Sequence, residues 1–172
     1  MTPQRISDAR RYEAAVAVFA VVLFIALCIA TSGVISLFAE QDVLAQRDAS
    51  ILLVPAMFVV AAAALYLGLV SAAGRTGAAL LLSALGIGVG CYLFFLVSGA
   101  TLYSVGSGEP FRGILFVGAN AGRPFSIALA VIAAVVAIAY LLLVSARTRR
   151  LDGRPPRWPW EQQDDDDRRS LD

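Results

Sequence analysis

The chain has 172 residues, of which 59% are hydrophobic and 16% are charged, and its mean hydropathy is +0.75. Soluble domains have apolar and charged shares nearer to a half and a quarter, so this composition indicates a membrane protein. All 14 basic residues are Arg, 13 residues are acidic, and there is no His, which excludes chemistry that depends on imidazole. The length allows about four membrane crossings, and we expect no separate soluble enzyme domain.

Four runs of the sequence are long, apolar and free of charge. A hydrocarbon core of about 30 Å requires roughly 20 successive apolar residues in a helix. Residues 14–39, 51–73, 77–103 and 124–146 meet this requirement without Asp, Glu, Lys or Arg. Backbone groups in lipid must be hydrogen-bonded within their own segment, so helices are expected. The sequence predicts an all-α, polytopic membrane protein with four transmembrane helices in an antiparallel bundle.

The first apolar run is expected to remain as a helix rather than to be cleaved as a signal peptide. Its roughly 25 residues exceed the 7 to 15 usual for the apolar region of a signal peptide. Leu37 also stands where a small residue would be needed three positions before the cut.

Arginine residues in the flanks and short loops predict the orientation. With both termini in the cytoplasm, nine Arg lie inside and three lie outside. Residues 1–13 then form a cytoplasmic N-terminal segment, residues 14–146 the transmembrane domain, and residues 147–172 a cytoplasmic tail. The short connection around Arg75 closes the second and third helices into a cytoplasmic hairpin.

The longer outer connection, residues 104–123, contains a further candidate for a short helix. It is too short to span, but Pro110 suits the first position of a helix. The apolar residues that follow would lie along the outer interface.

Small residues recur at helical spacing inside the spans. On the third run they are Ala79, Ser83, Gly86 and Gly90, and the last two form a GxxxG motif. Comparable rows are Ala61, Ala64, Gly68 and Ala72 on the second run, and Ser126, Ala130, Ala134 and Ala137 on the fourth. Such rows mark faces where helix backbones approach closely. We expect them to pack the bundle, and the alternative is a face that docks a partner or a second copy.

Hydroxyl residues gather toward the outer halves of the helices: Thr31, Ser32, Ser36, Ser98 and Thr101, with Ser126 at the start of the fourth run. They would either line a shallow polar pocket open to the outside or bond the carbonyls of their own preceding turns. Both interpretations stay open.

The two cysteines, Cys28 and Cys91, are predicted to pack as small apolar residues without a disulfide. Two thiols without His or carboxylate give no metal site, and no cofactor is expected. The spans also lack the buried carboxylate or His that proton-coupled transporters use. Because no base stands beside a Ser or Cys nucleophile in the spans, the protein is not expected to be an enzyme.

The tail changes abruptly to charge, Pro and Trp. An arginine cluster that includes Arg147, Arg149 and Arg150 would be attracted to anionic lipid. Trp158 and Trp160 follow within a Pro-rich stretch, and Trp favours the headgroup level. We expect an interfacial anchor with an acidic, solvated end, and the alternative is a docking peptide in which the two Trp are the main contacts.

The topology, the Lys-free composition and the closing segment Arg154-Pro155-Pro156-Arg157-Trp158-Pro159-Trp160-Glu161 resemble small four-helix membrane proteins of unknown function from high-GC actinobacteria. The resemblance implies no activity. It implies a setting in a bacterial plasma (inner) membrane, as a multi-pass protein.

The leading functional hypothesis is an accessory or scaffold subunit that acts by helix packing and tail docking. Its partners would be the lipid bilayer and either a second copy or another membrane protein, with no nucleic acid. The alternative is a small transporter or channel-like protein for a neutral or lipidic substrate that uses the outer hydroxyl cluster.

Overall fold

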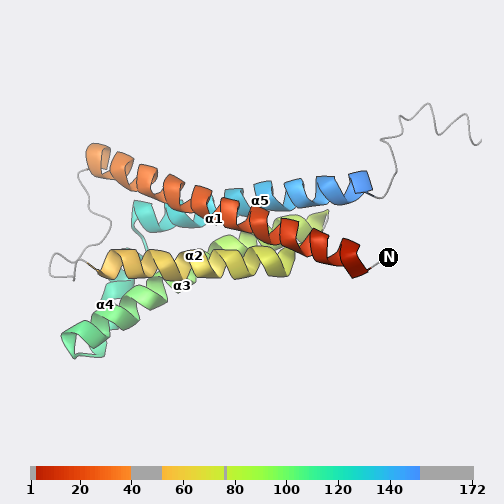
Figure 1. The fold of residues 1–172 in the computed structure, drawn as a ribbon. Helices are drawn as coiled ribbons and strands as arrows, with labels where there is room; N and C mark the ends of the chain where they lie inside the picture. The colour runs from red at the N-terminus through yellow and green to blue at the C-terminus, as the bar shows by residue number, and fades with distance from the viewer. Residues whose placement is uncertain (1–2, 40–51, 76, 152–172) are drawn as a thin grey trace, which may run out of the picture.

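A computed structural model describes residues 3–39, 52–75 and 77–151, and this part of the chain is entirely helical apart from turns. Its helices are α1 (Pro3–Ala39), α2 (Leu53–Ala72), α3 (Ala78–Ser107), α4 (Phe111–Asn120) and α5 (Pro124–Leu151) (Figure 1). Four of them contain segments long and apolar enough to cross a membrane: Arg11–Phe38, Leu53–Ala72, Ala78–Ser107 and Pro124–Ala146. The prediction of an all-helical protein with four such helices is confirmed.

Three helices extend beyond the predicted spans. The α1 helix begins at Pro3 and α5 continues to Leu151, because the Arg-rich flanks are good helix formers and carry the helix past the apolar run. The α3 helix continues to Ser107 rather than ending at Tyr103. It ends where Gly108 adopts a left-handed conformation with φ of 70°, which glycine tolerates without strain.

The α3 helix is central, since it packs against α2, α4 and α5, while α1 packs against α5 and α2. A tight turn joins α2 to α3, with positive φ at Gly74 (86°) and Gly77 (64°). This turn, the start of α1 and the end of α5 lie at one end of the molecule, here named the turn end (Figure 1). The opposite end, which carries α4, is named the α4 end.

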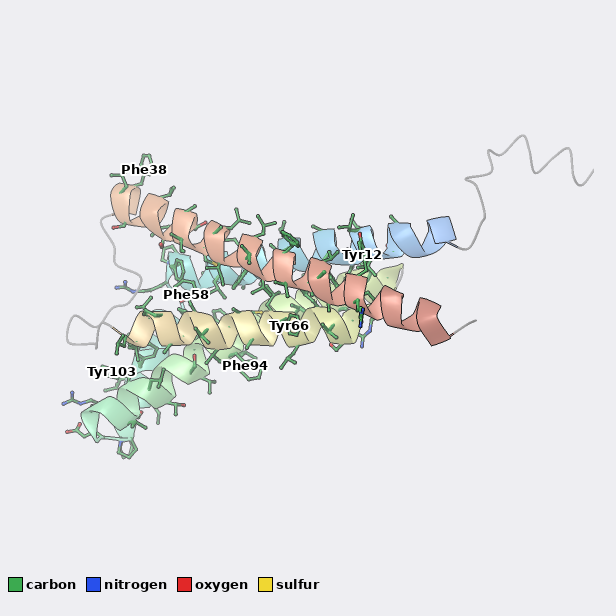
Figure 2. The ribbon with its side chains drawn as sticks, viewed as in Figure 1. Tyr12, Phe38, Phe58, Tyr66, Phe94 and Tyr103 are labelled. Atoms are coloured by element: carbon green, nitrogen blue, oxygen red, sulfur yellow. The ribbon has the colours of Figure 1, made fainter. Side chains whose placement is uncertain are left out.

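Aromatic rings form the core near the α4 end. Phe58 of α2, Phe95 of α3 and Phe125 of α5 have ring centroids 5.8 to 6.0 Å apart, so one cluster ties three helices together. Many other large apolar side chains point outward, among them Phe38 and Phe94 (Figure 2). An apolar outer surface on a bundle of this kind suits lipid.

The candidate helix after Pro110 is present as α4. Its Gly113 lies against α3, where a Cβ atom would collide with the Ser104 side chain. The ring of Phe116 lies 5.6 Å from that of Tyr103, centroid to centroid. The hairpin of α3 and α4 leaves the bundle to one side (Figure 1).

Candidate functional site: a groove between α2 and α3

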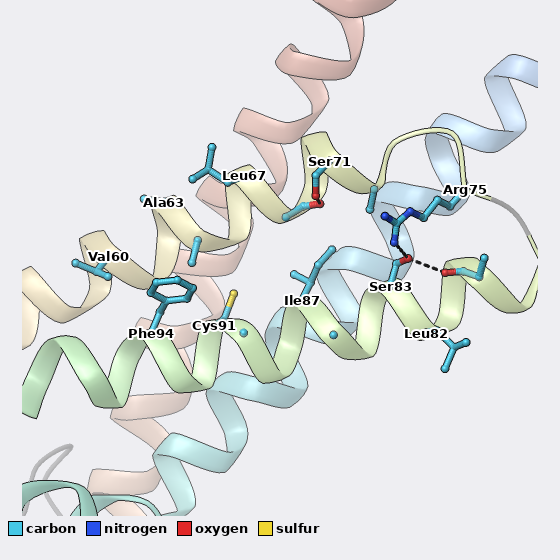
Figure 3. A pocket seen from close by; sticks show the side chains of 16 residues that line it. Val60, Ala63, Leu67, Ser71, Arg75, Leu82, Ser83, Ile87, Cys91 and Phe94 are labelled. Atoms are coloured by element: carbon cyan, nitrogen blue, oxygen red, sulfur yellow. Dashed lines mark hydrogen bonds between the residues drawn. The ribbon is translucent and has the colours of Figure 1, made fainter. Parts of the chain in front are cut away.

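A groove of about 930 Å³ runs between α2 and α3 on the outside of the bundle (Figure 3). Ala64, Gly68 and Ala72 line it from α2 at steps of four residues, which places them on one helix face. From α3 it is lined by the predicted row: Ala79, Ser83, Gly86 and Gly90. The structure therefore brings the small-residue rows of these two helices together at one groove.

The glycines of this groove have different surroundings. A Cβ atom at Gly68 would lie 2.9 Å from Cγ1 of Ile87, so this glycine lets α2 and α3 approach each other. At Gly86 and Gly90, a Cβ atom would meet nothing within 4 Å. The GxxxG motif therefore makes no close contact within the described chain, and its two glycines keep the groove open.

Close packing of α3 inside the bundle depends on a different glycine. A Cβ atom at Gly88 would lie 2.8 Å from the carbonyl oxygen of Ala130 and 3.0 Å from Cβ of Ala134. The predicted small-residue row of α5 thus contacts α3 at Gly88, which lies between the two glycines of the GxxxG motif in the sequence but on the opposite face of the helix.

The groove is polar at the turn end. Nη1 of Arg75 donates a hydrogen bond to Oγ of Ser83 over 2.6 Å, and that hydroxyl donates to the carbonyl oxygen of Ala79 over 2.7 Å (Figure 3). The Ser71 hydroxyl, also in the lining, donates to the carbonyl oxygen of Gly68 over 2.9 Å. At the other end Val60 and Phe94 line the groove, so it changes from cationic and polar to apolar along its length.

Arg75 was not predicted from the sequence to be a functional residue, and there it indicated only the orientation and the hairpin turn. The available signal was an Arg in a tight turn with a Ser eight residues later. Whether Arg75 reaches Ser83 depends on how the turn folds back, and the sequence spacing alone does not show this.

All of the residues of the predicted outer hydroxyl pocket lie in the part of the chain that the structure describes. The hydroxyls of Ser32, Ser98 and Thr101 donate to the carbonyl oxygens of Ile29, Phe95 and Val97 in their own helices. Ser36 is exposed and Thr31 is half-buried. None of these five residues lines the groove between α2 and α3, and the pocket stays a prediction.

The hydroxyl of Ser126 differs from the other outer hydroxyls. Ser126, at the start of α5, is fully buried, and its Oγ atom has no hydrogen-bond partner among the described residues. It belongs to the tightly packed interior rather than to the groove.

Both cysteines are buried and free. Cys91, at the base of the groove, directs its Sγ atom toward the carbonyl oxygen of Ala61 at 3.7 Å. Among the described residues, no group of three or more His, Cys, Asp or Glu side chains is placed to hold a metal ion.

Most residues of the predicted tail, 147–172, lie outside the part of the chain that the structure describes. Arg147, Arg149 and Arg150 belong to the last turns of α5, and the structure describes only their backbone. Trp158 and Trp160 lie outside the described residues, so the anchor and docking-peptide interpretations both stay predictions.

The chain matches the model of a protein family. Residues 6–168 match the model of a family of unknown function, DUF6121. The chain belongs to this family. The match includes all of the helices that contribute to the groove. No curated protein and no solved structure matches the chain.

Proposed function

We propose that this protein is a non-enzymatic membrane protein that binds a lipidic molecule in the groove between α2 and α3. The observation that carries the proposal is the groove itself, which is about 930 Å³ in volume, apolar over most of its length and polar at one end. Ligand pockets typically measure about 300 to 1,000 Å³. An amphiphile has the same distribution of polar and apolar groups as this groove. The sequence analysis gave a lipidic substrate as the alternative hypothesis. This proposal keeps the lipidic ligand but places it in the groove between α2 and α3 rather than at the outer hydroxyl cluster.

Retention of lipid by the purified protein tests this function. We expect native mass spectrometry to find the wild-type protein with one lipid bound after extensive detergent washing. The variants Gly86→Leu and Gly90→Leu place side chains in open space and fill the groove, so each should lose that lipid while keeping its helicity. Equal retention by the wild type and both variants would overturn the proposal.

An accessory or scaffold role is the second candidate, and the exposed GxxxG motif favours it. Gly86 and Gly90 have room above them for the backbone of another helix, from a second copy or a partner. Crosslinking in the native membrane followed by extraction in mild detergent tests this role. A stoichiometric partner lost in Gly86→Leu would support it, and a strictly monomeric protein without a partner would exclude it.

We further propose that the turn end faces the cytoplasm of a bacterial plasma membrane, with both termini inside. The distribution of Arg supports this orientation, since the helix flanks and short loops place nine Arg at the proposed inner side against three at the outer side. Cysteines introduced at Gly74 and at Gly118, in a background without Cys28 and Cys91, test it. In intact cells, a membrane-impermeant maleimide should label the second position and not the first.

A further inference from the structure

Resting on the proposed function, we infer that the groove selects an anionic phospholipid, with the headgroup phosphate on Arg75 and an acyl chain along Gly86 and Gly90. The inference concerns the class of lipid and the residue that recognises it. It is carried by the charge and hydrogen bonding of Arg75 together with the direction and length of the groove.

The guanidinium group of Arg75 has capacity for a ligand. A guanidinium carries five N–H donors, and the side-chain hydrogen bond of Arg75 goes to a neutral hydroxyl, that of Ser83. Among the described residues, Arg75 forms no ion pair with a carboxylate, and the Glu109–Arg112 pair lies at the α4 end. The side chain of Arg75 is exposed at the groove. Its positive charge is therefore accessible to an anion that enters from the turn end.

Phosphate suits this position because the planar guanidinium fork binds two of its oxygens at once. The hydrogen bond to Ser83 restricts the guanidinium to the α3 side of the turn, directly over the polar end of the groove. An anion held there would have the small residues of α2 and α3 immediately beneath it.

The length of the groove fits a lipid chain. On α3 the lining runs from Ala79 to Phe94, and these 15 steps correspond to about 22 Å of helix at about 1.5 Å per residue. One leaflet contributes about half of the 30 Å hydrocarbon thickness. A chain whose headgroup lies at Arg75 therefore finds apolar lining over the whole depth of its leaflet. A headgroup at Arg75 places the lipid in the leaflet of the turn end.

The test is a lipid titration of the full-length protein by native mass spectrometry. The probes are phosphatidylglycerol and phosphatidylcholine with identical acyl chains, compared for wild type, Arg75→Gln, Arg11→Gln and Gly86→Leu. Arg11 is exposed on α1 and does not line the groove, so Arg11→Gln is a matched loss of charge. Both lipids carry a phosphate, but the ammonium of phosphatidylcholine offsets the phosphate charge and is repelled by Arg75. We therefore expect the wild type and Arg11→Gln to bind phosphatidylglycerol about tenfold more tightly than phosphatidylcholine.

Arg75→Gln should lose this preference and still bind phosphatidylcholine, whereas Gly86→Leu should bind both lipids weakly. Equal binding of the two lipids by the wild type, with loss of both in Gly86→Leu, would overturn the inference and leave the proposed function intact. An equal loss of preference in Arg11→Gln would also overturn it, since it would show that net charge, rather than this site, attracts the lipid. If millimolar inorganic phosphate abolished this preference, the site would be one for free phosphate, and the assignment to a lipid headgroup would be overturned.

Discussion

Nη1 of Arg75 and Oγ of Ser83 lie 2.6 Å apart, joined by a hydrogen bond across the turn between α2 and α3. Ser83 is almost fully buried, whereas Arg75 is exposed. The contact therefore holds a charged group at the mouth of the groove by means of a residue anchored in the protein.

Replacement of Ser83 by Ala should loosen Arg75 without removing its charge. The variant removes the hydrogen bond from Arg75 and the one to Ala79, so we expect the free energy of unfolding to fall by about 1 to 2 kcal/mol, the usual net value of two hydrogen bonds. The preference for phosphatidylglycerol should become smaller but persist. Ser98→Ala is the matched control, because the Ser98 hydroxyl donates to the carbonyl oxygen of Phe95 in its own helix and Ser98 does not line the groove. Identical lipid preferences in the two variants would contradict a positioning role for Ser83.

Glycines on opposite faces of α3 should respond differently to a methyl group. Gly88→Ala places Cβ 2.8 Å from the carbonyl oxygen of Ala130, so the contact between α3 and α5 must open. We expect the free energy of unfolding to fall by about 1 to 3 kcal/mol, as for other overpacked interiors. Gly86→Ala meets open space and should leave stability unchanged. Denaturation with sodium dodecyl sulfate, followed by circular dichroism, measures both, and equal stabilities would refute the assignment of these faces.

Phe95 and its neighbour Phe94 form a second matched pair. Phe95 is fully buried between the rings of Phe58 and Phe125, whereas Phe94 points outward. Phe95→Ala should lower the free energy of unfolding by about 3 to 5 kcal/mol, mainly through the cavity that it leaves. Phe94→Ala should have little effect in the same denaturation experiment. A greater loss for Phe94→Ala would show that the aromatic cluster does not hold the bundle together.

Much of this fold follows from the sequence, because lipid imposes simple rules. Charge-free runs of about 20 residues must form helices there, and Gly108 ends α3 by a conformation that glycine adopts easily. The groove could be predicted from the sequence only in part. Rows of small residues indicate close approach, but they do not show which face is used inside the chain. Gly88 packs inside and Gly86 does not, a difference that depends on how α3 is rotated against α5.

The hairpin of α3 and α4 is expected to contact the outer leaflet. In α4, Phe111, Ile114 and Leu115 are 79%, 70% and 70% exposed, and the opposite face is buried on α3. The tip is polar, since Nε of Arg112 donates to the carboxylate of Glu109 over 2.9 Å, and this hydrogen bond raises the pKa of Arg112. Three exposed apolar side chains beside a polar tip are typical of a helix that lies at a membrane interface.

Fluorescence quenching by brominated lipids measures this contact. In a background with Trp158 and Trp160 replaced by Phe, Leu115→Trp should be quenched about as strongly as Leu85→Trp, a lipid-facing position within α3. Glu109→Trp, at the tip, should be quenched less. Strong quenching of Leu115→Trp by aqueous iodide, without quenching by lipid, would place α4 in water instead.

Occupation of the groove by lipid is tested most directly by photocrosslinking in the membrane. A phospholipid with a diazirine near the middle of one acyl chain would be incorporated into vesicles with the wild-type protein and activated by light. We predict that mass spectrometry finds crosslinks concentrated on groove residues such as Ile87 and Phe94, and that Gly86→Leu abolishes them. Crosslinks spread evenly over exposed positions such as Val131 and Val135 of α5, and unchanged in Gly86→Leu, would contradict the account.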